Sequence, residues 1–411
     1  MTDFEALKSM EQRLLWLSSW IVHNANHLRE KEEGDVKVGG HQASCASMVS
    51  IMAALYFHTL RPEDRVAVKP HASPVFHAMQ YMMGNQTREK LENFRGYGGA
   101  QSYPSRTKDV DDVDFSTGSV GLGVAITAFA SLMQDYLEAK PWASDRQLGR
   151  MIALVGDAEL DEGNVYECLQ EGWKHDLRNT WWIIDYNRHS LDGVVHEGLW
   201  EKIDAIFKAF GWRTVVLRHG VLQRAAFEEP GGKALKEWIQ TCPNADYSAL
   251  TYQGGAAWRK RLMDDIGDQG DVTTLLEKRS DDELSALMNN LGGQCVQTLT
   301  EAFDGVTDDQ PTVFLAYTIK GWGTPLAGHK DNHAGLMNPS QMTDFQKRMG
   351  VPQGEEWNVL AGIDNPDGLT ALMNDAAFFA KGRRRFDAPI VKSSGPVFLD
   401  DRNQSTQAGF G

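Results

Sequence analysis

The sequence predicts an α/β fold in which a mostly parallel sheet is flanked by helices. Two apolar segments, 151–155 (MIALV) and 181–184 (WWII), have the length and composition of buried strands, and an amphipathic segment typical of a helix separates them. Further strand-like segments follow at 211–217 (GWRTVVL) and 312–318 (TVFLAYT). Strands that alternate with helices favour a parallel sheet with helices on both faces.

The region before the first of these strands has a mainly helical pattern. Residues 8–30 carry apolar side chains at helical spacing, among them Leu14, Leu17 and Ile21. We then expect, in order, a glycine-containing turn (37–44), an apolar helix (46–58), a short strand (66–68), a second helix (87–94), a polar loop (101–114) and a long apolar helix that starts with glycines (118–139). The acidic run in the loop, 109–114, is typical of a solvated segment.

The second half of the chain has a different pattern. Residues 220–310 contain few strand signals, which predicts a helical excursion before the last strand. From residue 350 the order weakens, and GRRR (382–385), Pro389 and 393–396 are typical of a linker. We find neither an internal repeat nor a low-complexity tract.

The composition excludes several classes of protein. The 411 residues carry a net charge of −15, which argues against a nucleic acid or an anionic membrane as partner. No apolar run approaches the ~20 residues that span a bilayer, and acidic residues near the N-terminus are unlike a signal peptide. The four cysteines (Cys45, Cys168, Cys242 and Cys295) form no CxxC pair, so we expect reduced thiols and a cytoplasmic protein.

Polar side chains follow the two central strands at their carboxyl ends. Asp157 comes just after the first strand, and Asn187 follows it by 30 residues, just after the second. In an open α/β sheet, ligands bind in the crevice outside the carboxyl ends of the strands. A carboxylate and an amide oxygen that converge there form a hard-oxygen site for Mg²⁺, which shares its ligand shell with phosphates. The start of the adjacent helix suits a diphosphate.

Glycines lie beside this expected metal site. Gly121, Gly123 and Gly156 would allow the backbone to approach a diphosphate closely, and Ser119 offers a hydroxyl. The turn after Asp157 supplies further backbone N–H groups at Ala158, Glu159 and Leu160. We expect Ala158 to be already helical, because a positive φ there would strain an alanine.

Seven short motifs identify a family resemblance. The GD…N pattern that contains Asp157 and Asn187 resembles the thiamine diphosphate (ThDP) motif, and the chain from about residue 10 onward resembles the amino-terminal half of the homodimeric-type pyruvate dehydrogenase first component. Transketolase is a more distant relative. The motifs are VGGHQAS (38–44), HASP (71–74), SYP (102–104), TGSVGLG (117–123), NRHSLDG (187–193), YTIKGWG (317–323) and HKDNHAG (329–335).

The resemblance implies roles for individual residues. It makes His41, His71 and His333 active-site histidines, and histidine suits proton transfer near neutral pH. It places Lys320 near the substrate carboxylate or the diphosphate. It adds the backbone carbonyl of His189 to Asp157 and Asn187 as a ligand of Mg²⁺. It also places two further residues, Leu191 and Asp192, near the pyrimidine of the cofactor.

The resemblance also implies a domain organisation. Residues 1–350 would form the ThDP diphosphate-binding domain, residues 351–402 a linker, and residues 403–411 the start of an otherwise absent pyrimidine-binding domain. That domain would come from a second subunit or from the rest of a longer chain, in a dimer or an α₂β₂ assembly. We therefore expect the chain to be inactive without such a partner.

The implied reaction is the cleavage of a C–C bond next to a carbonyl, most directly the decarboxylation of a small-molecule 2-oxo acid. The enamine or acyl unit would pass to an acceptor, either a lipoyl group or an aldehyde. The chain starts almost directly at its first helix, where the family's pyruvate dehydrogenases carry a segment that docks a lipoyl acyltransferase. This weighs against lipoyl coupling and favours a free-standing lyase or a transketolase-like carboligase.

A third interpretation is a non-catalytic paralogue that keeps only the fold. The presence of Asp157, Asn187 and the three histidines argues against it, since a protein without catalysis has no need of this set.

Overall fold

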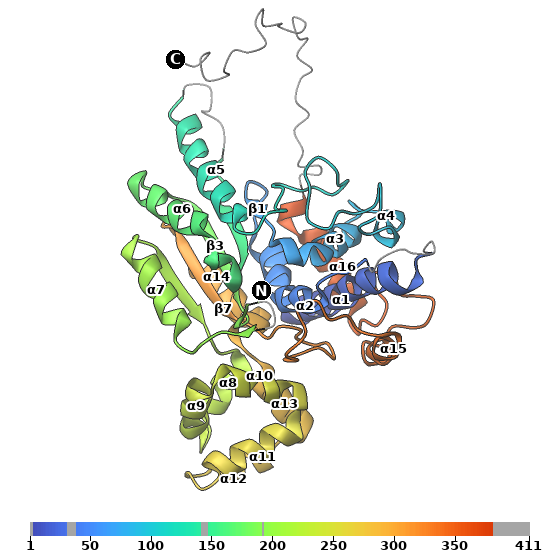
Figure 1. Ribbon diagram of the computed structural model, residues 1–411, viewed down its shortest axis with the longest axis vertical. Coiled ribbons are helices and arrows are strands. Elements are labelled where there is room, and N and C mark those ends of the chain that lie inside the picture. Colours follow the sequence, from blue (N-terminus) through green and yellow to red (C-terminus); the bar gives the residue numbers. More distant parts are fainter. Residues whose placement is uncertain (1–2, 31–37, 141–146, 191–192, 381–411) are drawn as a thin grey trace, which may run out of the picture.

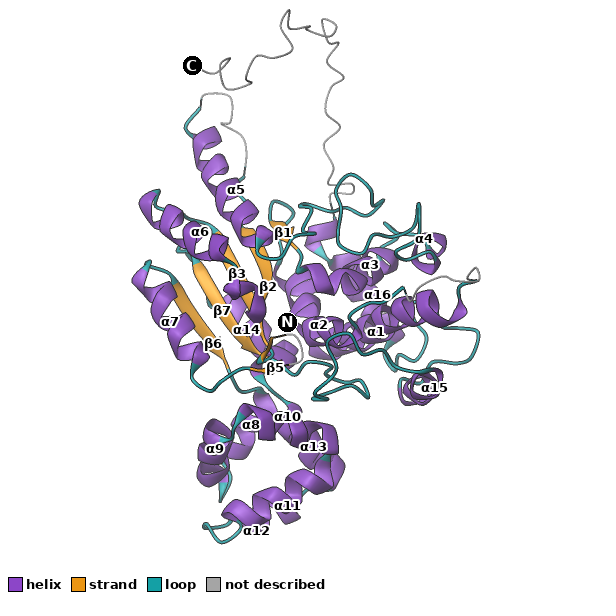
Figure 2. Ribbon diagram, in the orientation of Figure 1, coloured by secondary structure: helices purple, strands orange, loops and turns teal. Residues whose placement is uncertain are grey.

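A five-stranded parallel sheet forms the centre of the computed structural model, which describes residues 3–30, 38–140, 147–190 and 193–380 (Figures 1 and 2). The strand order is β1-β2-β3-β7-β6, and every neighbouring pair is parallel. The strands are β1 (Arg65–Ala67), β2 (Met151–Gly156), β3 (Thr180–Tyr186), β6 (Arg213–Leu217) and β7 (Thr312–Tyr317), and a short antiparallel ribbon of β4 (His189–Ser190) and β5 (Gly193–Val194) follows β3. The predicted α/β fold is confirmed.

Helices cover both faces of this sheet, because successive apolar side chains of β3 point to opposite faces and both sets are buried. Trp181 and Ile183 belong to one apolar core, whereas Trp182 and Ile184 belong to the other. The first core is closed by α1 (Phe4–His23), α2 (Gln42–Ala54), α3 (Ser73–Met82), α4 (Arg88–Glu92), α14 (Val296–Asp304), α15 (Pro339–Arg348) and α16 (Pro366–Asp375). The second core is covered by α5 (Leu122–Glu138), α6 (Gly163–Lys174) and α7 (Leu199–Ala209), and it continues into the helices between β6 and β7.

A helical lobe separates β6 from β7, as the sequence predicts. It consists of α8 (Val221–Phe227), α9 (Gly232–Thr241), α10 (Asn244–Gln253), α11 (Gly255–Ile266), α12 (Val272–Glu277) and α13 (Asp281–Asn289). The lobe is the yellow-green group of helices at the bottom of Figure 1. Its α10 reaches the carboxyl end of β3, where Ser248 Oγ lies 3.1 Å from His189 Nε2.

The acidic run 109–114 is not a solvated loop, so that prediction is wrong. Asp109, Asp111, Asp112 and Asp114 are all buried. Asp114 Oδ2 accepts a hydrogen bond of 3.0 Å from the backbone N–H of Val66 at the start of β1. Asp111 and Asp114 contact partners that are distant in sequence, His77 and Val66, which local charge patterning does not reveal.

Residues 351–380, expected as part of a linker, pack on the first core. The indole N–H of Trp16 donates to the Glu356 carbonyl at 2.8 Å, and Arg13 donates to the same carbonyl at 2.9 Å. Residues 381–402 of the expected linker and residues 403–411 lie outside the described part of the chain, and the domain boundaries stay a prediction. Within the described residues, no helix combines the length and apolar character that a bilayer crossing needs.

Candidate active site

The carboxyl ends of β2, β3 and β7 meet at one edge of the sheet. The strand register pairs Gly156 with Asp185 and Tyr186 with Tyr317, so the residues that follow these strands are neighbours. Asp157 opens a 3-10 turn, Asp157–Asp161, directly after β2. The two halves of the predicted metal motif therefore converge, because parallel strands end at the same edge.

Asp157 is a buried carboxylate, 5 % exposed, and backbone N–H groups hold it in place. Its Oδ1 accepts from Ala158 N at 3.0 Å, and its Oδ2 accepts from Arg188 N at 2.7 Å. Burial, followed by the nearby Asp185 carboxylate, raises the pKa of Asp157 to about 7. A carboxylate whose charge is disfavoured in this way has the chemistry of a cation ligand.

Asn187 and His189 follow β3 within the same turn. Asn187 Oδ1 accepts from His189 N at 3.1 Å, while Asn187 Nδ2 donates to Asp185 Oδ2 at 3.3 Å. The carboxylate, the amide oxygen and the backbone carbonyls of this turn are hard oxygen donors, so the residues fit a magnesium ion.

Two residues at the centre of this edge, Lys69 and Asp185, were missed by the sequence reasoning. Lys69 Nζ lies 2.6 Å from Asp185 Oδ2, and both side chains are buried. Asp185 Oδ2 also accepts from Ser47 Oγ at 2.6 Å, and its Oδ1 accepts from Thr318 Oγ1. Both residues are polar and stand at or just after strand ends, which is the signal that could have identified them.

The charges of this pair stabilise each other. Burial alone would raise the pKa of Asp185, but the Lys69 ammonium and the hydrogen bonds hold it below its ordinary value. Burial alone would lower the pKa of Lys69, but Asp185, Asp157 and Glu159 raise it. Gly156 makes room for the lysine, because a Cβ there would stand 3.0 Å from Lys69 Cε.

The side chain of Glu159 joins the predicted diphosphate-binding residues Ser119, Gly121, Gly123 and Gly156, which we call the glycine cradle. The N–H of Gly121 donates to Glu159 Oε2 at 3.0 Å, and the N–H of Gly156 donates to Oε1 at 2.9 Å. Glu159 therefore acts here through its carboxylate, whereas the sequence suggested its backbone N–H. Gly121 has φ +76° and caps the N-terminus of α5, and its Cβ would meet Asn164 Oδ1 at 2.8 Å.

The remaining cradle residues lie around this turn. Ser119 is exposed just before α5, and Gly123 is in its first turn. Ala158 lies in the 3-10 turn and is not among the described residues with positive φ, so the expectation of a relaxed alanine is confirmed.

The three predicted histidines are brought together from three segments. Their ring centroids are separated by 4.2 Å (His41 and His71), 5.2 Å (His41 and His333) and 5.7 Å (His71 and His333). His41 precedes α2, His71 lies in the turn after β1, and His333 lies in the loop after β7. Lys320, buried at the end of β7, has its Nζ 3.4 Å from His333 Nδ1.

Two of these histidines are neutral at pH 7. Burial lowers the pKa of His41 to about 4, and nearby His333 and Arg95 act in the same direction. Burial lowers the pKa of His71 to about 3, and His41 and Lys69 add to this. A neutral imidazole can accept a proton at one nitrogen and donate a hydrogen bond from the other, which suits chemistry at a carbonyl.

Other residues of the seven motifs stand outside this group. Tyr103 lies at its border, with its ring centroid 6.1 Å from that of His71. His329 packs against Tyr252 at 4.7 Å instead. Leu191 and Asp192 lie outside the described residues, so their expected role is untested.

Comparisons with known proteins agree with this geometry. Residues 36–227 match the family described as "Transketolase, thiamine diphosphate binding domain". The chain is 26% identical to the pyruvate dehydrogenase E1 component of Corynebacterium glutamicum, over 86% of this chain and 40% of the relative. It is 27% identical to that of Escherichia coli (strain K12), over 77% of this chain and 37% of the relative. The chain thus spans about two fifths of the length of these relatives.

Solved structures with a similar fold are transketolases. The enzyme from Campylobacter jejuni superposes with a TM-score of 0.58 at 19% identity, covering 91% of this chain and 49% of the other. The one from Leishmania mexicana gives a TM-score of 0.54 at 16% identity, covering 93% and 48%. The fold and the converging motif residues agree with the match of residues 36–227 to the thiamine diphosphate binding domain of transketolase, in a chain that resembles part of the pyruvate dehydrogenase E1 components.

Proposed function

We propose that this chain is the diphosphate- and metal-binding part of a ThDP- and Mg²⁺-dependent enzyme that cleaves a C–C bond next to a carbonyl, with a 2-oxo acid as substrate. The observation that carries the proposal is that Asp157 and the turn at Asn187 meet at one sheet edge. The Lys69 ammonium interacts with Asp157 and also with His41 and His71, so the histidine group lies beside this edge. Bound ThDP would supply the carbon nucleophile and the electron sink.

The metal and the diphosphate would be held by the residues at the strand ends. Asp157, Asn187 and the His189 carbonyl would bind Mg²⁺. Ser119, Gly121 and Gly123 would face the diphosphate at the N-terminus of α5, where the helix dipole favours an anion. The buried Lys69–Asp185 pair would fix the floor of this site, because it links β1, β3 and, through Thr318, the end of β7.

The histidine group would form hydrogen bonds to the reacting carbonyl of the substrate. Neutral His41 and His71 can donate a hydrogen bond to a substrate carbonyl oxygen and stabilise the charge that develops there. Lys320, beside His333, would bind the carboxylate of a 2-oxo acid. The low pKa values of His41 and His71 support this assignment, since an imidazole that stays neutral keeps one N–H to donate to the carbonyl oxygen.

A partner would complete the site. Apolar side chains are exposed at helical spacing on α5, which starts at the glycine cradle, and they are Leu122, Phe129, Met133 and Tyr136. An apolar stripe of this kind is typical of a surface that another protein covers. We propose that a pyrimidine-binding domain, on a second subunit or on the rest of a longer chain, covers this face in a dimer or α₂β₂ assembly.

The four cysteines are free thiols, which agrees with the proposed cytoplasmic location.

Metal binding tests the first part of the proposal. Asp157→Asn should weaken Mg²⁺ binding, measured by calorimetry in the presence of ThDP, by ~10-fold or more, because it removes the anionic ligand. Asp161→Asn is the matched control, since Asp161 is exposed in the same turn and should be neutral. Equal affinities of the two variants would contradict the assignment.

Affinity capture from the native source, followed by assays of the assembled pair, tests the second part. We expect decarboxylation of pyruvate or 2-oxobutyrate by the pair and little turnover by the chain alone. Turnover of ketose phosphates without 2-oxo acid decarboxylation would instead favour the transketolase-like carboligase.

A further inference from the structure

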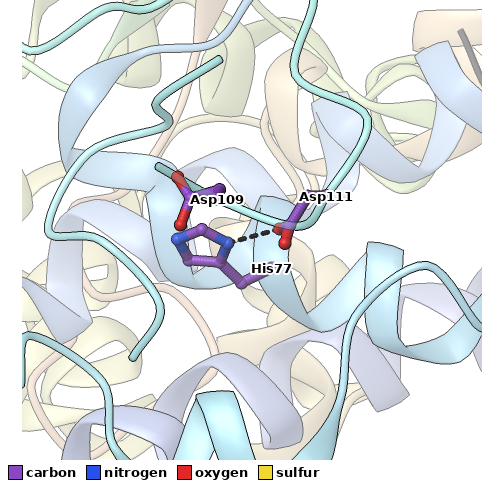
Figure 3. Close-up of side chains that lie close together, drawn as sticks. All are labelled: His77, Asp109 and Asp111. Atoms are coloured by element: carbon purple, nitrogen blue, oxygen red, sulfur yellow. Dashed lines mark hydrogen bonds and ion pairs between the residues drawn. The ribbon is translucent and has the colours of Figure 1, made fainter. Parts of the chain in front are cut away.

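The acidic loop 101–114, between α4 and α5, is fixed by a buried histidine that the proposed mechanism does not use. His77 projects from α3 toward Asp109 and Asp111 (Figure 3), and all three side chains are buried. His77 Nδ1 lies 2.5 Å from Asp111 Oδ2, and His77 Nε2 lies 3.0 Å from the carbonyl oxygen of Gln101. Both ring nitrogens therefore face hydrogen-bond acceptors. The Gln101 carbonyl oxygen cannot donate a hydrogen bond, and neither can the Asp111 carboxylate when it is ionised.

This environment requires a protonated ring. A carbonyl oxygen cannot donate, so Nε2 must carry a hydrogen, and an ionised Asp111 demands a second one on Nδ1. Burial alone would lower the pKa of His77, but the Asp111 carboxylate, with help from Asp109, raises it to about 9. His77 is thus an imidazolium at neutral pH.

The same three side chains have the composition of a metal site, with ligand atoms within 4.8 Å of one another, but their oxygens are engaged by N–H donors. Asp109 Oδ1 accepts from Gln101 N at 2.9 Å, and its Oδ2 accepts from Ser105 N at 2.7 Å. Asp111 Oδ1 accepts from Gln86 Nε2. A cation at this cluster would need a free lone pair on the ring, but both ring nitrogens already contact acceptors, Asp111 and the Gln101 carbonyl, so the geometry favours an ion pair.

Asp109, two residues before Asp111 in the same loop, holds the backbone around Tyr103. Asp109 binds the backbone on both sides of this residue, at Gln101 and Ser105. Ser73 Oγ, on the same helix as His77, donates to the Ser102 carbonyl at 2.6 Å. The Tyr103 ring that results from this arrangement stands 6.1 Å from that of His71. Helix α3 follows the turn that contains His71 directly, so the same helix holds both the 101–114 loop and His71.

We propose that His77 is a positioning residue: its charged contact with Asp111 clamps the 101–114 loop onto α3 and sets where Tyr103 stands beside His71. The contacts between His77, Asp111 and Gln101 support the clamp directly. Its effect on catalysis rests on the proposed function. Tyr103 would then form a wall of the substrate pocket whose position depends on a charge pair outside it.

The protonation state is testable in the unsubstituted full chain. Nitrogen-15 NMR of the His77 ring at pH 7 should show both nitrogens protonated. A neutral ring would overturn the proposal. So would a metal ion, detected by mass spectrometry at one equivalent per chain, whose removal by a chelator also removes the protection of the 101–105 backbone from hydrogen exchange. Neither readout depends on activity.

Substitution tests the clamp. His77→Gln and the milder Asp111→Asn should speed hydrogen exchange in the 101–105 segment on the order of 100-fold, which corresponds to ~2.8 kcal/mol, the scale of a broken buried pair. His58→Gln is the matched control, because His58 forms a similar pair with Asp304 at 2.9 Å, where the aspartate is 61% exposed. Unchanged exchange of the segment in a folded Asp111→Asn variant would overturn the proposal.

The link to catalysis is read in the assembled enzyme. Asp111→Asn should raise KM more than it lowers kcat, and it should have no further effect when Tyr103 is already alanine, because the two act through one contact. Additive effects would show that the clamp does not act through Tyr103 and would overturn the proposal. Failure to find any ThDP-dependent activity would count against the proposed function alone, since the NMR and exchange results stand apart from it.

Discussion

Replacing Lys69 with methionine should be among the most destabilising single changes at the sheet edge. The substitution keeps the side chain up to the position of Cε and removes the ammonium group with its charge. It leaves Asp185, which is fully buried, with hydrogen bonds from Ser47, Thr318 and Asn187 but without a counter-ion. We therefore expect the loss to come from an uncompensated buried carboxylate.

The magnitude follows from the geometry of the pair. Nζ and Oδ2 are 2.6 Å apart, and both side chains are withdrawn from water. Removing one partner of such a buried pair costs about 3–5 kcal/mol. Lys8→Met is the control, because Lys8 and Glu5 form a pair of similar length, 2.9 Å, with 59% and 74% of their side chains exposed. Exposed pairs contribute about 0–1 kcal/mol.

Urea unfolding of the three proteins measures the difference. The Lys69→Met loss should be smaller at pH 5 than at pH 8, because burial without a cation raises the pKa of Asp185, and protonation then removes the penalty. The double variant Lys69→Met/Asp185→Asn should recover most of the stability. A loss no larger than that of Lys8→Met, or no recovery in the double variant, would refute the reasoning.

Two further predictions use the glycine cradle and the histidine group. Gly121→Ala should destabilise the fold by about 1–3 kcal/mol, and by more than Gly84→Ala, because both residues have φ near +77° but only Gly121 has atoms in the path of a Cβ; equal losses in urea unfolding would show that the contact with Asn164 does not matter. His41 and His71 have folded pKa values of about 4 and 3, below the unfolded value near 6.5, so their contribution is complete above that value and is lost as the pH falls toward 4. His71→Asn should therefore flatten the decline in melting temperature over this range, and a decline as steep as in the unsubstituted chain would contradict the cause.

The sequence predicted the elements whose signals are local. Segments 151–155 and 181–184 are apolar on both faces, which is what a central parallel strand requires, and they became β2 and β3. The site residues that follow these strands were predictable for the same reason, since parallel strands place their carboxyl ends together. Asp157 and Asn187 needed only that rule.

The residues that were missed depend on contacts across the chain. Lys69 and Asp185 are 116 positions apart, and neither stands out until β1 and β3 lie in one sheet. The burial of Asp111 depends on His77, which is 34 positions away. Arg188 adopts a φ of +65° and so turns its N–H toward Asp157. No side-chain pattern around Arg188 announces this backbone conformation.

The charge at the sheet edge agrees with the proposed binding of a cation there. Asp157, Glu159 and Asp185 are buried together, and the Lys69 ammonium interacts with all three. Burial raises the pKa of Asp157 to about 7 and also raises that of Glu159. The ionised form of these two buried carboxyl groups is therefore disfavoured when no further cation is bound. Apolar residues of similar size would give a more stable edge. A divalent ion beside Asp157 would offset this excess charge, which explains why a stable fold would retain the cluster.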